Sequence, residues 1–365
     1  MSVHAPKGGV AALLAVALLA VALLAVALVA CAPTSVASPT PAVSPTVAPT
    51  PVPSATAAPT SAPSQSATPI PLPTGAQLAA AGSGVVWMTL GGHLFLSGDR
   101  GATWSERALP PQPVQITTIT FVDAQHGWVL STGSPATQCQ AQGAAIWRTD
   151  DGARTWKRIV DLVVGANAQP VAGISPGQCK EDLAFADATH GFFDSWDPNG
   201  RPTIYRTTDG GTSWAAARLP DPPGFTTQAG GFSLHPGPVA DFGAVQLVSA
   251  LGNSGTKDTT YVFRSTDGGA SWTYAATTPD LSPGAVIVFL TATRWIAPLA
   301  PAPWDETADG GATWHAFTTD YSQAAPIAPQ IVFGDAETGY ATVRGGLQRT
   351  TDGGAHWTAL KTPGT

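Results

Sequence analysis

Two carboxylates stand close together in the segment DSWDPNGR, residues 194–201. Asp194 and Asp197 flank Trp196, and Arg201 follows them. A glycosidase needs two such carboxylates about 5–9 Å apart beside a groove, one as general acid and the other as base or nucleophile. The same residues are also typical of a polar Asp-Pro-Asn-Gly turn. The turn is the favoured interpretation, and the carboxylate pair is the alternative.

A second group of charged residues, Lys180, Glu181 and Asp182, precedes this segment. We expect both groups in long loops, at 161–183 and 194–203, and long loops on a rigid scaffold are where binding sites usually occur. Tryptophan together with arginine is typical of a binding centre. The competing interpretation is variable loop sequence that binds nothing. The candidate binding residues are Asp194, Trp196, Asp197, Arg201 and Lys180.

Other kinds of site have no signal in the sequence, which contains no phosphate-binding loop, zinc pattern or nucleophile elbow. His126 and His190 occupy the same position of a repeat, but they lack metal-ligand spacing. The formal net charge of −7 argues against nucleic acid as a partner. We therefore expect no metal, no cofactor and no catalytic residue.

The elements that must position the candidate residues come from an eight-residue repeat, Ser/Thr-x-Asp-Gly-Gly-x-Thr/Ser-Trp. Its six copies recur at intervals of 42 to 58 residues, which is the size of a propeller blade. The Asp can accept hydrogen bonds from backbone N–H groups of its own turn, the glycines allow positive φ, and the Trp supplies a large apolar face. We expect these residues to fold hairpins rather than to catalyse. They are Asp99, Trp104, Asp151, Trp156, Asp209, Trp214, Asp267, Trp272, Asp309, Trp314, Asp352 and Trp357.

A second repeat, Phe-x-Asp-x-x-x-Gly-aromatic, precedes several of these Asp boxes, at 121–128, 185–192 and 333–340. Each copy predicts an apolar strand, a turn and a second strand. A third strand leads into the box, and the box Trp begins a fourth. Six periods of four strands predict an all-β fold, a six-bladed β-propeller with four-stranded antiparallel blades and Asp-box hairpins. A seven-bladed propeller is the alternative.

Four arginines share one position of the repeat, just before the box turn. A ring of arginines could hold an acidic partner. A repeated structural salt bridge or a packed aliphatic stem is the favoured interpretation. The four are Arg148, Arg206, Arg264 and Arg349.

The boxes and the Phe-x-Asp turns, over about residues 76–363, resemble the propellers of the photosystem II assembly/stability-factor-like family. The wider BNR-repeat superfamily also includes sialidases and xyloglucanases. The resemblance implies the fold, and for the assembly factors it implies non-catalytic binding of a membrane protein during its maturation. A sialidase implies an Arg-Ile-Pro motif before the first box and a Tyr–Glu pair. No arginine lies between 76 and 99, and no glutamate sits beside a tyrosine.

The start of the chain predicts export. Residues 10–30 are 21 consecutive apolar residues that follow Lys7, as in a secretory signal. Leu28-Val29-Ala30-Cys31 ends this run and resembles the lipobox of bacterial lipoproteins, whose cysteine is lipidated and becomes the new N-terminus. An uncleaved membrane anchor and plain secretion are the alternatives. We expect a signal peptide at 1–30 and a lipid-anchored protein on the extracytoplasmic face of the cell membrane.

The rest of the chain divides into a tether and a domain. Residues 31–74 begin with the lipidated cysteine and are rich in Pro, Thr, Ser and Ala without any charge, so we expect a disordered linker. Residues 75–365 form the propeller domain. Cys139 and Cys179 fall in loops expected on the face opposite the boxes, and outside the cytoplasm such a pair favours a disulfide. Two free thiols are the alternative.

The sequence therefore predicts a monomeric, non-catalytic, surface-tethered binding propeller whose partner is a protein of the membrane or envelope. An assembly or stability factor is the narrower expectation. The alternative is a carbohydrate-binding or glycoside-hydrolase-like protein whose partner is a glycan. Both interpretations place the site on the face opposite the boxes, near the two cysteines.

Overall fold

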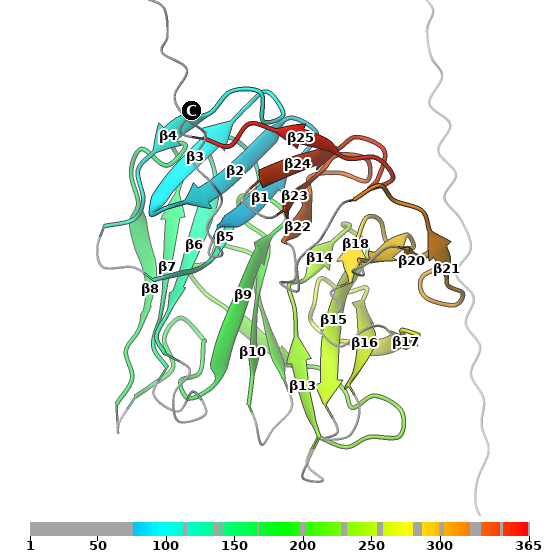
Figure 1. Cartoon of the computed structure of the whole chain (residues 1–365). Helices are drawn as coiled ribbons and strands as arrows, with labels where there is room; N and C mark the ends of the chain where they lie inside the picture. The colour runs from blue at the N-terminus through cyan, green and yellow to red at the C-terminus, as the bar shows by residue number, and fades with distance from the viewer. Residues whose placement is uncertain are drawn as a thin grey trace, which may run out of the picture. The chain divides into compact units, whose positions relative to one another are not determined.

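Six antiparallel sheets, the blades, make up the folded part of the chain, so the prediction of a six-bladed propeller is confirmed (Figure 1). The predicted lipidation site Cys31, the predicted signal at 1–30, the predicted linker at 31–74 and the candidate binding residue Arg201 all lie outside the described residues. No helix within the described residues has the length and apolar character needed to span a membrane. The computed structural model describes residues 76–111, 115–134, 139, 142–165, 168–197, 202–227, 232–253, 258–279, 287–298, 303–321, 330–343 and 346–363.

Each blade pairs its strands in chain order, from the innermost strand to the outermost. Blade 1 has β1 (Gln77–Ala81), β2 (Val85–Leu90), β3 (His93–Ser97) and β4 (Ser105–Arg107). Blade 2 has β5 (Ile116–Phe121), β6 (Gly127–Thr132), β7 (Ala144–Thr149) and β8 (Lys157–Leu162). Blade 3 has β9 (Cys179–Phe185), β10 (Gly191–Trp196), β11 (Thr203–Thr207) and β12 (Ala215–Arg218).

The second half of the ring repeats this pattern, except that the first strand of blade 4 is split into two pieces that both pair with β15. Blade 4 has β13 (Ser233–Pro236), β14 (Ala240–Asp241), β15 (Gln246–Asn253), β16 (Asp258–Ser265) and β17 (Thr273–Thr277). Blade 5 has β18 (Val288–Phe289), β19 (Trp295–Ala297), β20 (Trp304–Thr307) and β21 (His315–Phe317). Blade 6 has β22 (Ile331–Phe333), β23 (Gly339–Val343), β24 (Gly346–Thr350) and β25 (Thr358–Leu360).

The hydrophobic core is divided into six clusters, one between each pair of neighbouring blades. Successive strand residues point to opposite faces of a sheet, so one strand serves two clusters. On β2, Trp87 packs with blade 2, whereas Val86 and Met88 pack against Tyr340 of blade 6. The cluster that contains Val86, Met88 and Tyr340 therefore joins the last blade to the first, and the ring closes with six blades.

Ring closure uses side chains rather than an exchanged strand. The backbone N–H of Leu78 donates to Gln330 Oε1 at 2.6 Å, and Trp104 Nε1 donates to the carbonyl of Lys361 at 3.2 Å. Arg349 Nη1 donates to the carbonyl of Arg100, at 3.0 Å, in the box of blade 1. Closure therefore depends on a few polar contacts and on the shared apolar cluster.

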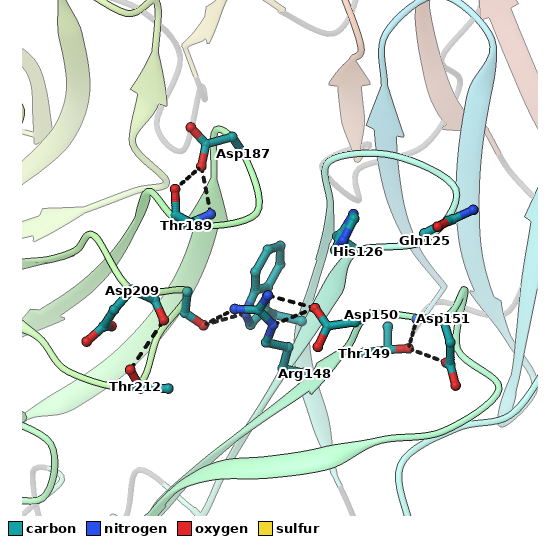
Figure 2. A network of polar contacts seen from close by, with 12 residues as sticks. Gln125, His126, Arg148, Thr149, Asp150, Asp151, Asp187, Thr189, Asp209 and Thr212 are labelled. Carbon is teal, nitrogen blue, oxygen red and sulfur yellow. Dashed lines mark hydrogen bonds and ion pairs between the residues drawn. The ribbon is translucent and has the colours of Figure 1, made fainter.

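The contact of Arg349 recurs between blades 2 and 3. Arg148 Nη1 donates to the carbonyl of Gly210, at 3.3 Å, which is the same box position as Arg100. Figure 2 shows Arg148 held from its other side by Asp150, with 2.7 Å between Nη2 and Oδ1. The guanidinium also lies over the ring of Trp128, 5.4 Å from its centroid. At these two positions the repeated arginine connects one blade to the box of the next.

Replacing Arg349 tests this role in ring closure. We expect Arg349→Ala to lower the free energy of unfolding by about 1 kcal/mol, because a charge-assisted hydrogen bond to a blade 1 carbonyl is lost near the surface. The matched control is Arg206→Ala, since Arg206 holds the same repeat position but its side chain makes no hydrogen bond to another described residue. Urea denaturation measures both variants, and equal losses would contradict a closure role for Arg349.

The box hairpins repeat one hydrogen-bond pattern. In blade 3, Thr207 Oγ1 donates to Asp209 Oδ1 at 2.8 Å, and the backbone N–H and Oγ of Ser213 donate to the two carboxylate oxygens at 2.9 and 2.6 Å. These donors hold the pKa of Asp209 below its ordinary value, despite the opposing effect of burial. All six box aspartates therefore serve as acceptors within their own turns.

The Phe-x-Asp turns lie at the same end of each blade as the boxes. The backbone N–H of Gly210 in the box donates to the carbonyl of Thr189 in the turn at 2.9 Å, and the same bond recurs in blades 2, 5 and 6. The motif needs its glycine because a Cβ at Gly191 would lie 2.5 Å from the ring of Phe185. We call this end the box face. The other end, where β9 begins and β10 ends, is the opposite face.

Candidate functional site

A β-bulge at the opposite-face end of blade 3 brings three carboxylates together. Phe193 pairs with Leu183 and Ser195 pairs with Lys180, so Asp194 alone faces both Glu181 and Asp182. An extra residue in one strand bends the ladder and redirects side chains, and bulges are frequent beside functional sites. The backbone N–H of Asp182 donates to Asp194 Oδ1 at 3.1 Å, which fixes the bulge.

The carboxylates differ in how far they reach water. Asp194 is 1% exposed, and its Oδ2 has no hydrogen-bond partner among the described residues. Burial, followed by the neighbouring Asp182 charge, raises the pKa of Asp194 well above its ordinary value. Asp182 is half-buried, and burial together with the Glu181 charge raises its pKa to about 6. Glu181 is exposed. The cluster therefore runs from a buried inner carboxyl group with a raised pKa to an outer carboxylate exposed to water.

Trp196 forms the outer wall of this cluster and connects blade 3 to blade 4. Its Nε1 donates to Glu181 Oε1 at 2.8 Å. Its ring packs on His235 of β13, with 3.9 Å between centroids and 43° between planes. Burial lowers the pKa of His235, which favours the neutral imidazole beneath the indole. The result is a half-buried aromatic side chain fixed on two sides, with a carboxylate at its edge.

Lys180 lies inside the sheet, so the prediction that the candidate residues lie in loops at 161–183 and 194–203 is wrong for Lys180, Asp194 and Trp196. The structure places Lys180 in β9, 1% exposed, and Asp194 and Trp196 in β10, because these residues continue the ladder between the two strands. Lys180 Nζ donates to the carbonyl of Gln178 at 2.6 Å, and burial lowers its pKa to about 8. Its ammonium group is therefore held by the backbone at the start of β9.

The predicted disulfide is present and lies beside the bulge. Cys139 and Cys179 are bonded, with 4.9 Å between their Cα atoms, and both are buried. Next to the disulfide, the backbone N–H of Lys180 donates to Gln142 Oε1 at 2.8 Å. The disulfide thus fastens the segment between β6 and β7 of blade 2 to the first residue of β9. The start of the strand that carries the acidic cluster is fixed covalently.

The structure brings together some of the candidate residues and leaves others apart. Asp194 and Trp196 share β10, and Lys180 shares β9 with Glu181 and Asp182. Asp197 directly follows β10 and interacts with other residues there. From the sequence, Glu181 and Asp182 were expected only as neighbours of the site, and His235 was not expected there. The segment around His235 matches neither repeat, so no sequence pattern indicated it.

A separate hollow lies on the propeller axis, where the innermost strands meet. The cavity has a volume of about 290 Å³, and every blade contributes to its wall. It opens among the Phe-x-Asp turns, beside Gly82, Asp241 and Asp335, at the box face. Among the described residues, no three His, Cys, Asp or Glu side chains are grouped closely enough to hold a metal ion.

Known proteins resemble this chain in fold. No protein-family model and no curated protein matches it. Similar solved structures include YCF48 bound to a D1 peptide, with 18% identity, a TM-score of 0.41, and coverage of 78% of this chain and 96% of that one. The GH74 enzyme of Niastella koreensis has 14% identity and a TM-score of 0.44, covering 77% and 46%. The Hadza microbial sialidase Hz136 has 12% identity and a TM-score of 0.49, covering 75% and 65%.

Proposed function

We propose that this protein is a non-catalytic binding propeller, attached to the cell membrane by a lipid on Cys31, that holds a protein of the membrane or envelope against its opposite face. The observation that carries the proposal is the fixed group formed by Trp196, Glu181 and His235. A rigid aromatic side chain with a polar edge is typical of the central residue of a protein interface. The resemblance to assembly factors favours a maturing membrane protein as the partner.

The burial of Asp194 favours binding over catalysis. A glycosidase carboxyl must contact the scissile bond, or a water molecule beside it. Asp194 is 1% exposed and lies within the sheet, so the pair that it would form with Asp197 does not face a sugar. The acidic residues of blade 3 therefore fit a binding surface better than an acid–base pair.

The position of β1 supports a tethered partner. Gln77 begins β1, and its Nε2 donates to the carbonyl of Thr117 in β5. Thr118 Oγ1 in turn donates to the carbonyl of Glu181 at 2.9 Å. The chain thus enters the propeller on the same face as the acidic cluster. A partner that meets the propeller on the side where the chain enters it would therefore contact the acidic cluster.

A glycan is the second candidate ligand, because a partly exposed indole beside carboxylates can also stack on a sugar ring. Crosslinking in the native host distinguishes a protein partner from a glycan and tests whether the partner binds the opposite face. We expect the photoreactive amino acid p-benzoylphenylalanine at position 196 to capture one protein repeatedly, and the same amino acid at exposed Thr212 in a box to capture none. Capture from position 212 alone, or turnover of chromogenic glycosides by the protein, would overturn the proposal.

A further inference from the structure

In the part of the chain that the structure describes, the acidic cluster of blade 3 has no basic side chain paired with it. Within the described residues, none of Glu181, Asp182 and Asp194 forms an ion pair with a basic side chain. The nearest lysine in sequence, Lys180, directs its ammonium group to the carbonyl of Gln178 instead. Carboxylates crowded at a bulge repel one another, and a buried carboxyl without a counter-charge is costly. The described residues therefore leave the cluster without a positive charge to balance it.

Asp194 gives an independent sign that the cluster is incomplete. Its Oδ2 is buried and has no partner, although native proteins satisfy most buried polar side-chain atoms. Its carboxyl group faces Asp182 through the hydrogen bond from the Asp182 backbone. A positive charge near Asp182 would therefore stabilise the outer carboxylates directly and the inner carboxyl through them.

Trp196 adds a feature suited to a cation. Its indole lies next to Glu181, with Nε1 already bound to Oε1, so the second oxygen of Glu181 is left for an incoming donor. A cation over or beside an indole ring is attracted by the ring as well as by the carboxylate. Among the described residues, the charged groups around this position are Glu181, Asp182 and Lys180 on β9, Asp194 on β10, His235 on β13 and Asp258 on β16.

We propose that the partner presents a lysine or arginine side chain to Glu181 and Asp182, beside Trp196. The proposal rests on the function proposed above, and it names the chemistry that the partner must carry. An ammonium or guanidinium group at this position supplies the counter-charge that the bulge lacks. A neutral segment would leave the carboxylates unpaired, and an acidic segment would be repelled by them.

The affinity for such a cation must depend on the pH, because cation binding and proton binding compete at Asp182. Burial and Glu181 raise the pKa of Asp182 to about 6, so part of the Asp182 population is protonated in mildly acidic solution. A cation favours the ionised carboxylate, and by reciprocity ionisation of Asp182 favours the cation. The affinity for a cation therefore rises as the pH increases from 5 to 7. Protonation of His235 at low pH also weakens the binding of a cation. A variant must therefore separate the effect of Asp182 from that of His235.

The experiment measures binding of the peptide tetralysine to the full-length protein by calorimetry at low salt, where charge interactions are least screened. The peptide's amines stay charged between pH 5 and 7. We expect the association constant to increase about tenfold from pH 5 to pH 7. In Asp182→Asn this increase should be lost, although His235 is retained. Glu181→Gln should weaken binding at both pH values, and tetraglutamate should not bind.

The matched control is Asp187→Asn, at the box-face end of the same hairpin, which should bind tetralysine as the wild-type protein does. Equal affinity at both pH values in the wild type, or an unchanged pH dependence in Asp182→Asn, would overturn the inference. The crosslinking test gives a separate readout. Capture of a protein from position 196 without proton-linked tetralysine binding refutes only the cation. Proton-linked tetralysine binding without capture at 196 refutes the proposed function.

Discussion

Removing the Cys139–Cys179 disulfide is expected to lower the free energy of unfolding by about 4 kcal/mol. The bond closes a loop with a sequence separation of 40 residues, so the unfolded chain gains considerable freedom without it. For a domain of this size, such a loss corresponds to a decrease in Tm on the order of 10 °C. Calorimetry of the Cys139→Ser/Cys179→Ser double variant measures the change.

The same variant should loosen one region more than the others. Cys179 begins β9, and Lys180 beside it is held by Gln142 from blade 2, so hydrogen exchange should accelerate at 179–185. The control region is β23, which lies in blade 6 and has no contact with the disulfide. The matched control protein is the wild type treated with a reductant. A Tm within a degree or two of the wild-type value would contradict a stabilising disulfide.

Asp182→Asn is expected to increase stability at pH 7.5, by about 2–3 kcal/mol. The pKa of Asp182 is raised from 3.8 to about 6 in the folded protein. Between these values the folded state binds more protons than the unfolded state, so stability falls as the pH rises, and the penalty persists above pH 6. An asparagine carries no charge and removes that penalty. Denaturation in urea at pH 4 and at pH 7.5 measures the difference.

The control for this prediction is Asp187→Asn, in the turn of the same hairpin. Asp187 accepts hydrogen bonds from the backbone N–H groups of Thr189 and His190 at 2.7 and 2.8 Å, and these donors lower its pKa despite partial burial. A depressed pKa contributes stability above the unfolded value, so Asp187→Asn should be less stable than the wild type at pH 7.5. If Asp182→Asn were also less stable at pH 7.5, the description of the acidic cluster would be wrong.

The propeller could be predicted because its signal is local and repeated. Each box needs only its own eight residues, since Ser or Thr, Asp and Gly satisfy one another within the turn, as Thr207, Asp209 and Gly211 do. Six copies predicted six blades and their register, with seven blades as the alternative. The disulfide was predictable for a similar reason, because the register placed Cys139 and Cys179 on one face.

The candidate site was predicted only in part, because it depends on a strand irregularity and on a neighbouring blade. Lys180 and Asp194 were predicted to be loop residues, since charged side chains are rare inside a sheet. In the structure they continue the ladder, and the bulge between Phe193 and Ser195 directs Asp194 toward Asp182. His235 reaches Trp196 from β13, a contact between blades that no spacing within either segment encodes.

The central claim is that the opposite face of blade 3 binds the partner. The most direct test uses the protein captured from position 196 and measures its affinity for the wild type, Trp196→Ala and Thr212→Ala with purified components. Both variants must first be shown to keep the wild-type Tm. A central interface residue contributes at least about 2 kcal/mol, so Trp196→Ala should weaken binding about 30-fold or more. Thr212→Ala, on the box face, should leave the affinity unchanged. Unchanged affinity in Trp196→Ala, or an equal loss in both variants, would contradict the account.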